Sequence, residues 1–533
     1  MKRRDRKVIA ERKRNLARAG RLRRISHRTC RASGGRNLTL STEAGATMTK
    51  QTRRGFLKSA GALAASAGLS WFLRPSSLSA AGSSEPKRPN IFFFFPDQHR
   101  FDWLGTNPNL PLRTPNLDGL ASRGVRFTNA LTPSPLCAPA RACLAAGKEY
   151  DHCGVANNGQ DYPISQTTFY GLLRESGYHV AGCGKFDLHK ASYTWGLDGK
   201  HLLKEWGFSD GIDNAGKMDA IASGAKEPKD PYMADLKDKG LLETHVADFR
   251  KRGGYRGTFP TPLPEEAYCD NWVANNGLEL MKRFPARKPW FLQINFTGPH
   301  SPLDITKRMD AICRGRDFPQ PNRCTQFTPE AHVAMRQNYS AMVENIDRWL
   351  GIYIERLKER GELDNTLIVW SSDHGDMLGD HDQWGKSSPY QPSVGVPLIA
   401  AGPGVRRGLV SDAPVSVLDL TATFLEYARL AKPGEMESRS LKALLEGKTD
   451  RHRPFVLSGL NQWRLVFDGR YKLVRGYGGG GKGKRKGERG VRAVGKGVPP
   501  LLLDLQNDPL ENTNIAEKVP DEVSRLSRLL DGV

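Results

Sequence analysis

The sequence predicts an α/β fold with a mostly parallel sheet flanked by helices, followed by a small antiparallel α+β subdomain at the C-terminal end. Two observations carry this prediction. From Pro89 onward, short apolar runs of strand type alternate with helical stretches, as in a parallel sheet covered by helices. After about Asp450 the pattern changes to short strands and turns. A chain of 533 residues is long enough to bury the core of both parts.

Four apolar segments are predicted to be buried strands of the parallel sheet. They cover residues 90–95, 178–182, 290–296 and 366–370. The apolar spacing predicts a helix over residues 166–177 and a long amphipathic helix over residues 329–360, ended by Gly361. Residues 200–264 show no clear periodicity, so we expect an irregular insertion that faces the substrate.

The C-terminal part is predicted to contain a hairpin, with strands at 464–467 and 471–474 and a turn at Asp468-Gly469. Residues 476–497 form a Gly-rich loop that holds seven basic residues and one acidic residue. Two interpretations of this loop stay open: a solvated flexible segment, or a contact for a polyanionic substrate. We therefore divide the chain into a leader (1–81), a catalytic domain (88–445) and a C-terminal subdomain (446–533).

The net charge of +23 is concentrated in the leader. Residues 1–47 contribute +12 and residues 48–81 contribute +5, which leaves +6 for the rest of the chain. A basic chain of this kind is typical of nucleic-acid binding only when the charge lies on the folded domain. No nucleic-acid partner is therefore expected.

The leader resembles a twin-arginine export signal. Arg53-Arg54 precedes a modestly apolar stretch over residues 59–73 and a small-residue run, Ser79-Ala80-Ala81. The alternatives are a basic amphipathic anchor and a membrane-spanning helix, but the stretch is short and rich in Gly, Ala and Ser. We expect a bacterial protein that folds first, crosses by the twin-arginine machinery, and is periplasmic or secreted. Translation is expected to start at Met1 or Met48.

The eight cysteines show no zinc-type spacing. Cys313 and Cys324 flank a Pro-rich loop, and the sequence leaves open whether they pair.

Residues of the metal-ligand type follow two of the predicted strands. Asp97-Gln98 comes after the first strand, and Asp373-His374 comes after the fourth. The carboxyl ends of parallel strands meet at one edge of a sheet, where ligands bind. Oxygen ligands with one imidazole suit a hard divalent cation, most simply Ca²⁺, with Mg²⁺ or Mn²⁺ as alternatives. An Asp after a strand is also a common helix cap, so each pair alone is a weak signal.

Between these two pairs stands Cys137-Ala138-Pro139-Ala140-Arg141. With the motifs around it, the chain resembles the sulfatase family of the alkaline-phosphatase-like superfamily. The resemblance covers most of residues 89–520, and its segments are 89–100, 102–105, 114–118, 124–130, Gly184-Lys185, Pro299-His300, Asp373-His374-Gly375, 381–386 and 504–514.

The resemblance implies that a formylglycine-generating enzyme oxidises Cys137 to formylglycine. This aldehyde hydrates to a carbon with two hydroxyls, of which one attacks sulfur and the other later expels sulfate. The cation is implied to lie among the side chains of Asp97, Gln98, Cys137, Asp373 and His374.

The resemblance also implies roles for the remaining site residues. Arg141 and Lys185 are expected to position the hydrate and the developing charge. His300 and Lys386 are expected to flank the sulfate and assist the leaving oxygen. Many sulfatases have a His two residues after the Lys of Gly-Lys as the base for elimination. Here Asp187 stands there and His189 follows, so either residue is a candidate for that base.

Two further departures bear on the reaction. The second metal position is Gln98 instead of Asp, and the last is His374 instead of Asn or Asp. Both also occur in relatives that hydrolyse phosphonate monoesters and phosphodiesters. The leading hypothesis is a hydrolase of sulfated small molecules or polysaccharides, and the second is a phosphonate or phosphodiester hydrolase. A third, a catalytically silent sulfate binder, is disfavoured by the intact set of site residues. Nothing in the sequence indicates an oligomeric state.

Overall fold

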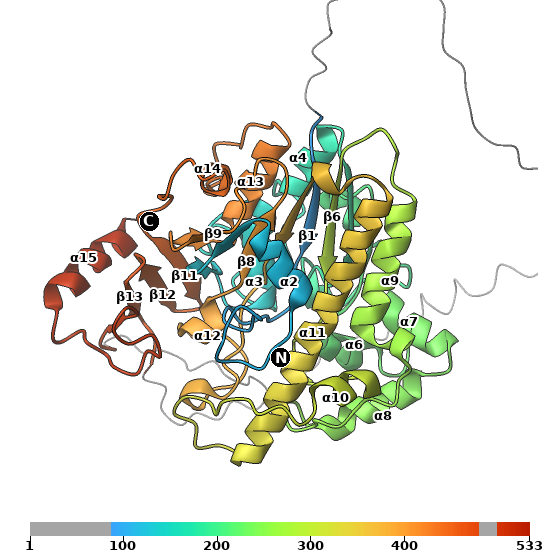
Figure 1. Ribbon diagram of the computed structural model, residues 1–533, viewed down its shortest axis with the longest axis horizontal. Coiled ribbons are helices and arrows are strands. Elements are labelled where there is room, and N and C mark those ends of the chain that lie inside the picture. The colour runs from blue at the N-terminus through green and yellow to red at the C-terminus, as the bar shows by residue number, and fades with distance from the viewer. Residues whose placement is uncertain (1–86, 479–497, 533) are drawn as a thin grey trace, which may run out of the picture. The chain divides into compact units, whose positions relative to one another are not determined.

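The computed structural model describes residues 87–478 and 498–532, which belong to one compact unit of the chain (Figure 1). The twin-arginine segment and most of the basic Gly-rich loop lie outside the described residues.

The large sheet has eight strands and confirms the α/β prediction. The five strands from β5 to β7 are parallel, and β8 runs antiparallel to both of its neighbours. The spatial order is β5 (Asp210–Asp213), β4 (His179–Gly184), β6 (Trp290–Asn295), β1 (Asn90–Phe94), β7 (Thr366–Trp370), β8 (Leu398–Ala401), β2 (Val125–Phe127) and β9 (Leu409–Ser411). All four predicted strands are present in this sheet.

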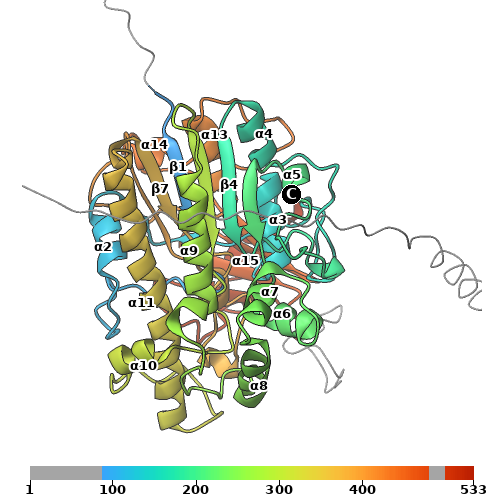
Figure 2. The same ribbon diagram turned by 90° about the vertical axis from the view of Figure 1, so that its right-hand side faces the viewer.

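Helices cover both faces of the sheet (Figures 1 and 2). Successive side chains of a strand point to opposite faces, and β1 is apolar on both. Ile91 and Phe93 pack into one core, whereas Phe92 and Phe94 pack into the other. The first core contains α3 (Cys137–Ala146), α4 (Phe169–Glu175) and α13 (Asp419–Tyr427), and the second contains α2 (Pro115–Ser122), α9 (Cys269–Lys282) and α11 (Pro329–Glu359).

The two predicted helices are present. Residues 166–177 contain α4, which begins where the side chain of Thr168 accepts a hydrogen bond from the Gly171 N–H. The helix α11 is capped in the same way by Thr328 and ends just before Gly361, whose φ of 64° favours glycine.

The expectation of an irregular segment over residues 200–264 is wrong. The segment contains β5 and the helices α5 (Leu203–Trp206), α6 (Lys217–Gly224), α7 (Pro231–Asp238) and α8 (Leu242–Arg252). Asp230 caps α7 by accepting from the Met233 N–H. Leu236 and Val246 are buried, but lysines and acidic residues fill the exposed positions of these short helices. Because so many positions are charged, the helical repeat of apolar residues is hard to recognise in the sequence.

The C-terminal part forms a separate antiparallel sheet, as predicted. Its strands in order are β11 (Val456–Leu460), β12 (Trp463–Phe467), β13 (Tyr471–Arg475) and β14 (Leu501–Asp504). Leu526 of α15 (Pro520–Asp531) packs on this sheet against Val466, Leu473 and Leu502.

The domain boundary expected at residues 445–446 stays a prediction. The other strands and α-helices of the described residues are β3 (Ala130–Leu131), β10 (Val415–Ser416), α10 (Lys307–Cys313), α12 (Gln391–Val394) and α14 (Lys442–Leu445).

Cys313 and Cys324 are separate thiols in the structure. The Cys313 Sγ lies 3.0 Å from the Gln337 carbonyl oxygen, and the Cys324 Sγ lies 3.4 Å from Asp382 Oδ1. Over residues 87–478 and 498–532, no helix combines the length and the apolar character that a membrane span requires.

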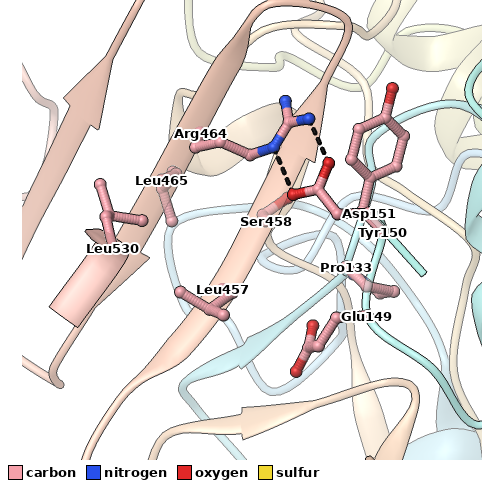
Figure 3. Close-up of a pocket in the computed structure, with 9 residues that line it drawn as sticks. All are labelled: Pro133, Glu149, Tyr150, Asp151, Leu457, Ser458, Arg464, Leu465 and Leu530. Carbon is pink, nitrogen blue, oxygen red and sulfur yellow. Dashed lines mark hydrogen bonds and ion pairs between the residues drawn. The ribbon is translucent and has the colours of Figure 1, made fainter. Parts of the chain in front are cut away.

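A small cavity of about 50 Å³ lies between the loop after α3 and the C-terminal sheet (Figure 3). Asp151 and Arg464 form an ion pair at this cavity, while Glu149 is buried and its Oε2 has no hydrogen-bond partner among the described residues. Burial raises the pKa of Glu149 to about 8, although Arg453 lies 3.7 Å away.

This raised pKa predicts how Glu149→Gln changes stability with pH. The folded chain holds the Glu149 proton more tightly than the unfolded chain, so the wild type loses stability as pH rises from about 4.5 to about 8. Glutamine stays neutral. The variant should therefore unfold at a higher temperature than the wild type near pH 9, by about 1 °C per kcal/mol gained in a folded unit of this size. Calorimetry at several pH values checks this, and a difference that is the same at pH 5 and pH 9 would contradict it.

Candidate active site

The predicted site residues converge where the parallel strands end. Asp97 and Gln98 follow β1, Lys185 follows β4, His300 lies beyond β6, and Asp373 with His374 follows β7. Cys137 is the first residue of α3. Asp97, Cys137, Lys185, His300 and Lys386 all line one cleft of about 160 Å³.

Cys137 is buried and lines this cleft. Its Sγ lies 2.9 Å from Lys386 Nζ, 3.2 Å from His374 Nε2 and 3.8 Å from Asp97 Oδ1. The N-terminus of α3 adds the positive end of a helix dipole, and the next N–H, that of Ala138, donates to Asn158 Oδ1 at 3.0 Å. Any oxygen carried by residue 137 therefore sits in a site that favours an anion.

The same environment acts on the cysteine thiol. Burial and the Asp97 carboxylate both raise the pKa of Cys137, but Lys185, Lys386 and His374 outweigh them. The pKa of this thiol is consequently well below its usual value.

Four side chains at this point could hold one metal ion. One ligand atom from each of Asp97, Cys137, Asp373 and His374 lies within 4.8 Å of the others, and all four residues are buried. The Gln98 amide oxygen reaches the same region, because Lys386 Nζ donates to it at 2.8 Å. Two carboxylates, an amide oxygen and an imidazole fit a hard divalent cation. The Cys137 sulfur stands where the oxygens of a formylglycine would lie.

Arg141 is four residues after Cys137 and so lies on the same side of α3. Its Nη2 and Nε are 2.9 and 3.0 Å from Asp373 Oδ2, and its Nη1 donates to the Lys185 carbonyl oxygen at 2.6 Å. The guanidinium thus joins the ends of β7 and β4 and fixes the Asp373 carboxylate. The pKa of Asp373 is raised, since burial outweighs the effect of Arg141.

Lys185 is buried between two carboxylates. Its Nζ forms ion pairs with Asp97 Oδ2 and, at 3.0 Å, with Asp187 Oδ2. Burial would lower the pKa of Lys185, but the two carboxylates raise it well above its usual value. Burial would likewise raise the pKa of Asp97, but Lys185, His300 and Lys386 hold it well below its usual range.

The two candidates for the elimination base lie in different surroundings. Asp187 contacts Lys185 and Lys190, which both line the cleft. The His189 ring does not line the cleft, and its Nε2 lies 3.2 Å from Asp213 Oδ2. Asp187 does not line the cleft either, so the two candidates differ in their partners: Asp187 pairs with cleft lysines and His189 pairs with Asp213. The role of each stays a prediction.

Several cleft residues were missed by the sequence reasoning, namely Asn158, Lys190, Gly216, Lys217, Met218 and Asp219. Lys190 pairs with Asp187 and Asp219, and Lys217 pairs with Asp304 at 2.6 Å. Residues 216–219 open α6, within the segment expected to be irregular but substrate-facing. The only sequence signal for residues 216–219 was the expectation that their segment faces the substrate; no local motif marks them.

A buried cysteine at a helix N-terminus, beside residues that could hold a cation and surrounded by basic side chains, suits a hydrolase of anionic esters. The comparisons with known proteins agree. The family model described as Sulfatase matches residues 89–430. The arylsulfatase of Clostridium perfringens is 29% identical over 471 residues, covering 83% of this chain and 94% of the relative. The N-acetylglucosamine-6-O-sulfatase of Bacteroides thetaiotaomicron is 27% identical over 408 residues, covering 68% and 72%.

Solved structures share the fold. The phosphonate monoester hydrolase of Agrobacterium radiobacter has a TM-score of 0.67 at 23% identity and covers 83% of this chain and 94% of its own. A protein solved in complex with its substrate D-glucosamine-2-N,6-O-disulfate has a TM-score of 0.65 at 20% identity and covers 84% and 97%. The family match spans more than half of the sequence, so this chain belongs to the sulfatase family. It is accordingly a sulfuric ester hydrolase.

The lowered pKa of Cys137 predicts its reactivity in protein made without the converting enzyme. With chelator present, iodoacetamide should modify Cys137 almost as fast at pH 7 as at pH 9, because the thiolate persists. Lys386→Met removes the ammonium 2.9 Å from the sulfur, which should raise the pKa. The variant should therefore lose more of its rate between pH 9 and pH 7 than the wild type does. Peptide mass spectrometry gives the rates.

Lys190→Met is the matched control, because Lys190 lines the same cleft but pairs with Asp187 and Asp219. Lys190 also interacts electrostatically with Cys137, so this change should alter the Cys137 profile, but less than Lys386→Met does. Equal profiles in wild type and Lys386→Met would contradict the assignment of Lys386 as a contact of the reacting atom.

Proposed function

We propose that this protein is an exported bacterial sulfatase that removes sulfate from carbohydrates, using formylglycine at position 137 and a Ca²⁺ ion. The observation that carries the proposal is the placement of Cys137. It lies at a helix N-terminus, within 4.8 Å of three cation ligands and in contact with Lys386.

The cation ligands are proposed to be Asp97, Gln98, Asp373 and His374, with residue 137 completing the set. A bound divalent cation would neutralise sulfate oxygens and polarise the nucleophile. The formylglycine would supply the hydroxyl that attacks sulfur. Oxygen ligands dominate the set, which favours Ca²⁺ over softer ions, and Mg²⁺ or Mn²⁺ remain alternatives.

The basic residues of the cleft are proposed to bind and orient the sulfate. Lys386 reaches residue 137 and Gln98 together, so its ammonium lies beside both the attacking atom and the cation site. Arg141 is held by Asp373 and stabilises the negative charge near residue 137. His300 lines the cleft, where it would donate a proton to the leaving oxygen.

Of the two candidate bases, position favours Asp187. Its Oδ2 accepts from Lys185 and Lys190, while its buried Oδ1 has no hydrogen-bond partner among the described residues. Asp187 and His189 both lie outside the cleft lining, but Asp187 contacts two lysines of the cleft, whereas His189 pairs with Asp213.

A carbohydrate substrate is supported by the relatives. The curated relatives include an N-acetylglucosamine-6-O-sulfatase, and the solved neighbours include a 2-O GAG sulfatase and a protein bound to a sulfated glucosamine. Residues 216–219 are well placed to contact the leaving sugar, because they line the same cleft as His300.

A second candidate is a phosphonate monoester or phosphodiester hydrolase. Gln98 and His374 favour it, since the same departures mark relatives with those activities. Both candidates use the same nucleophile and cation, so a substrate panel separates them.

Conversion and activity give the main test. Protein co-expressed with a formylglycine-generating enzyme should show formylglycine at position 137 by mass spectrometry. It should release sulfate from a panel of sulfated mono- and polysaccharides, and Cys137→Ala should lose at least about 10³-fold in kcat/KM. Converted protein that fails on the sulfated panel but cleaves phosphodiesters would establish the second candidate instead.

Export is tested separately. Replacing Arg53 and Arg54 together with Lys should retain the protein in the cytoplasm of a bacterial host, because the paired arginines are the feature that the signal shares with twin-arginine leaders. Cell fractionation measures this, with Arg74→Lys as the matched control. Unchanged export of the double variant would refute this route.

A further inference from the structure

The Gln98 side chain uses nearly all of its hydrogen-bonding capacity. An amide group has two N–H donors and an oxygen with two lone pairs. The Nε2 donates to Asp376 Oδ2 and, at 3.0 Å, to the Tyr255 hydroxyl. The Oε1 accepts from Lys386 Nζ at 2.8 Å. One lone pair of the oxygen is left over, and it belongs to the atom that faces the cation ligands.

The Gln98 backbone is held just as firmly. Its φ is 72°, an unfavourable value for a residue with a side chain. Its N–H donates to Asp373 Oδ1 at 3.0 Å, and its carbonyl oxygen accepts from the Tyr339 hydroxyl at 2.6 Å. The backbone therefore fixes where the amide lies, and the side-chain partners fix which end of it faces the cation.

Asp376 is the centre of this arrangement, and it is fully buried. Its Oδ2 accepts from Gln98 and, at 2.7 Å, from the Tyr255 hydroxyl. Its Oδ1 accepts from the backbone N–H groups of Leu378 at 2.9 Å and Gly385 at 3.1 Å. Gly385 immediately precedes Lys386. One carboxylate thus orients the Gln98 amide and holds the loop that presents Lys386.

We propose that Asp376, assisted by Tyr255, is a positioning residue that turns the Gln98 amide oxygen toward the cation and places Lys386 beside it. The inference rests on the proposed cation site. Asp376 can only accept hydrogen bonds from its neighbours, so the amide nitrogen must face it and the oxygen must face away. Partners of this kind orient metal ligands and contribute to metal affinity.

The proposal also explains why position 98 holds an amide. A carboxylate there would set an acceptor against Asp376 Oδ2, and both groups are buried. A glutamine satisfies both neighbours, since its NH₂ group donates to Asp376 and its oxygen is available to the cation. Residues 98 and 376 therefore form a matched pair of one amide and one carboxylate.

The test exchanges the members of this pair. In Asp376→Asn, the Leu378 and Gly385 N–H groups keep the new amide oxygen on their side, so its NH₂ faces the Gln98 NH₂. The Gln98 amide must then turn its nitrogen toward the cation. We expect Ca²⁺ affinity to fall by about 10- to 100-fold in isothermal titration calorimetry on converted, chelator-treated protein.

In a Gln98→Glu background the same change should act in the opposite direction. Asp376→Asn then supplies a donor to the carboxylate introduced at position 98, so Ca²⁺ affinity should rise instead of fall. This reversal of sign distinguishes positioning from a general loss of stability. Asp382→Asn is the matched control, because Asp382 lies on the same loop but accepts from Thr325. It should leave Ca²⁺ affinity within about twofold, as expected for a site without this contact.

The outcomes separate this inference from the function it rests on. A wild type that binds no Ca²⁺, Mg²⁺ or Mn²⁺ overturns the cation site and this inference with it. A wild type that binds, with Asp376→Asn unchanged or weakened equally in both backgrounds, overturns the inference alone. If Asp376→Asn does not fold, as judged by thermal unfolding in chelator, Tyr255→Phe decides. It removes the acceptor for the second amide N–H and should weaken binding by a smaller factor, whereas an unchanged affinity overturns the inference.

Discussion

The ion pairs of Lys185 with Asp97 and Asp187 set the charge of the entire cleft floor. Burying three charges is costly unless each has a partner in contact, and removing one leaves the others uncompensated. Lys185 occupies one oxygen of Asp97 and leaves the other facing Cys137 and His374. Arg141 occupies Asp373 in a similar way. The carboxylates are therefore partly neutralised before a cation binds, and the site can hold a cation and an anionic ester together.

The sequence predicted those parts of the site that are local. Asp97-Gln98 and Asp373-His374 directly follow apolar strands, so a strand prediction places them at the sheet edge. Cys137 and Arg141 are four residues apart on one helix. Tyr255 could not be found in this way, because it contacts residue 98 from 157 positions away, through a segment whose charged surface hides its helices. The path of the chain between elements depends on such long-range packing, which no local pattern encodes.

The presence of glutamine at position 98 has a different meaning once its neighbours are known. Read from the sequence, Gln98 removes a negative charge from the cation site. In the structure, the carboxylate of Asp376 lies directly behind the amide, with the Tyr255 hydroxyl beside it. The negative charge thus lies on Asp376, behind the Gln98 amide, and polarises the amide whose oxygen would bind the cation. The glutamine alone is thus a weak guide to whether the natural ester contains sulfur or phosphorus.

The C-terminal sheet is joined to the cleft by a buried contact. Lys472 of β13 is fully buried and forms an ion pair with Glu511, whose Oε2 accepts from the Gln391 N–H at 2.6 Å. Gln391 begins α12, five residues after Lys386. The sheet is therefore not a module that can be exchanged freely. A chimera that brings a foreign C-terminal sheet to this catalytic core has to bring its own match for Gln391, and replacing Lys472 or Glu511 alone would leave a buried charge without its partner.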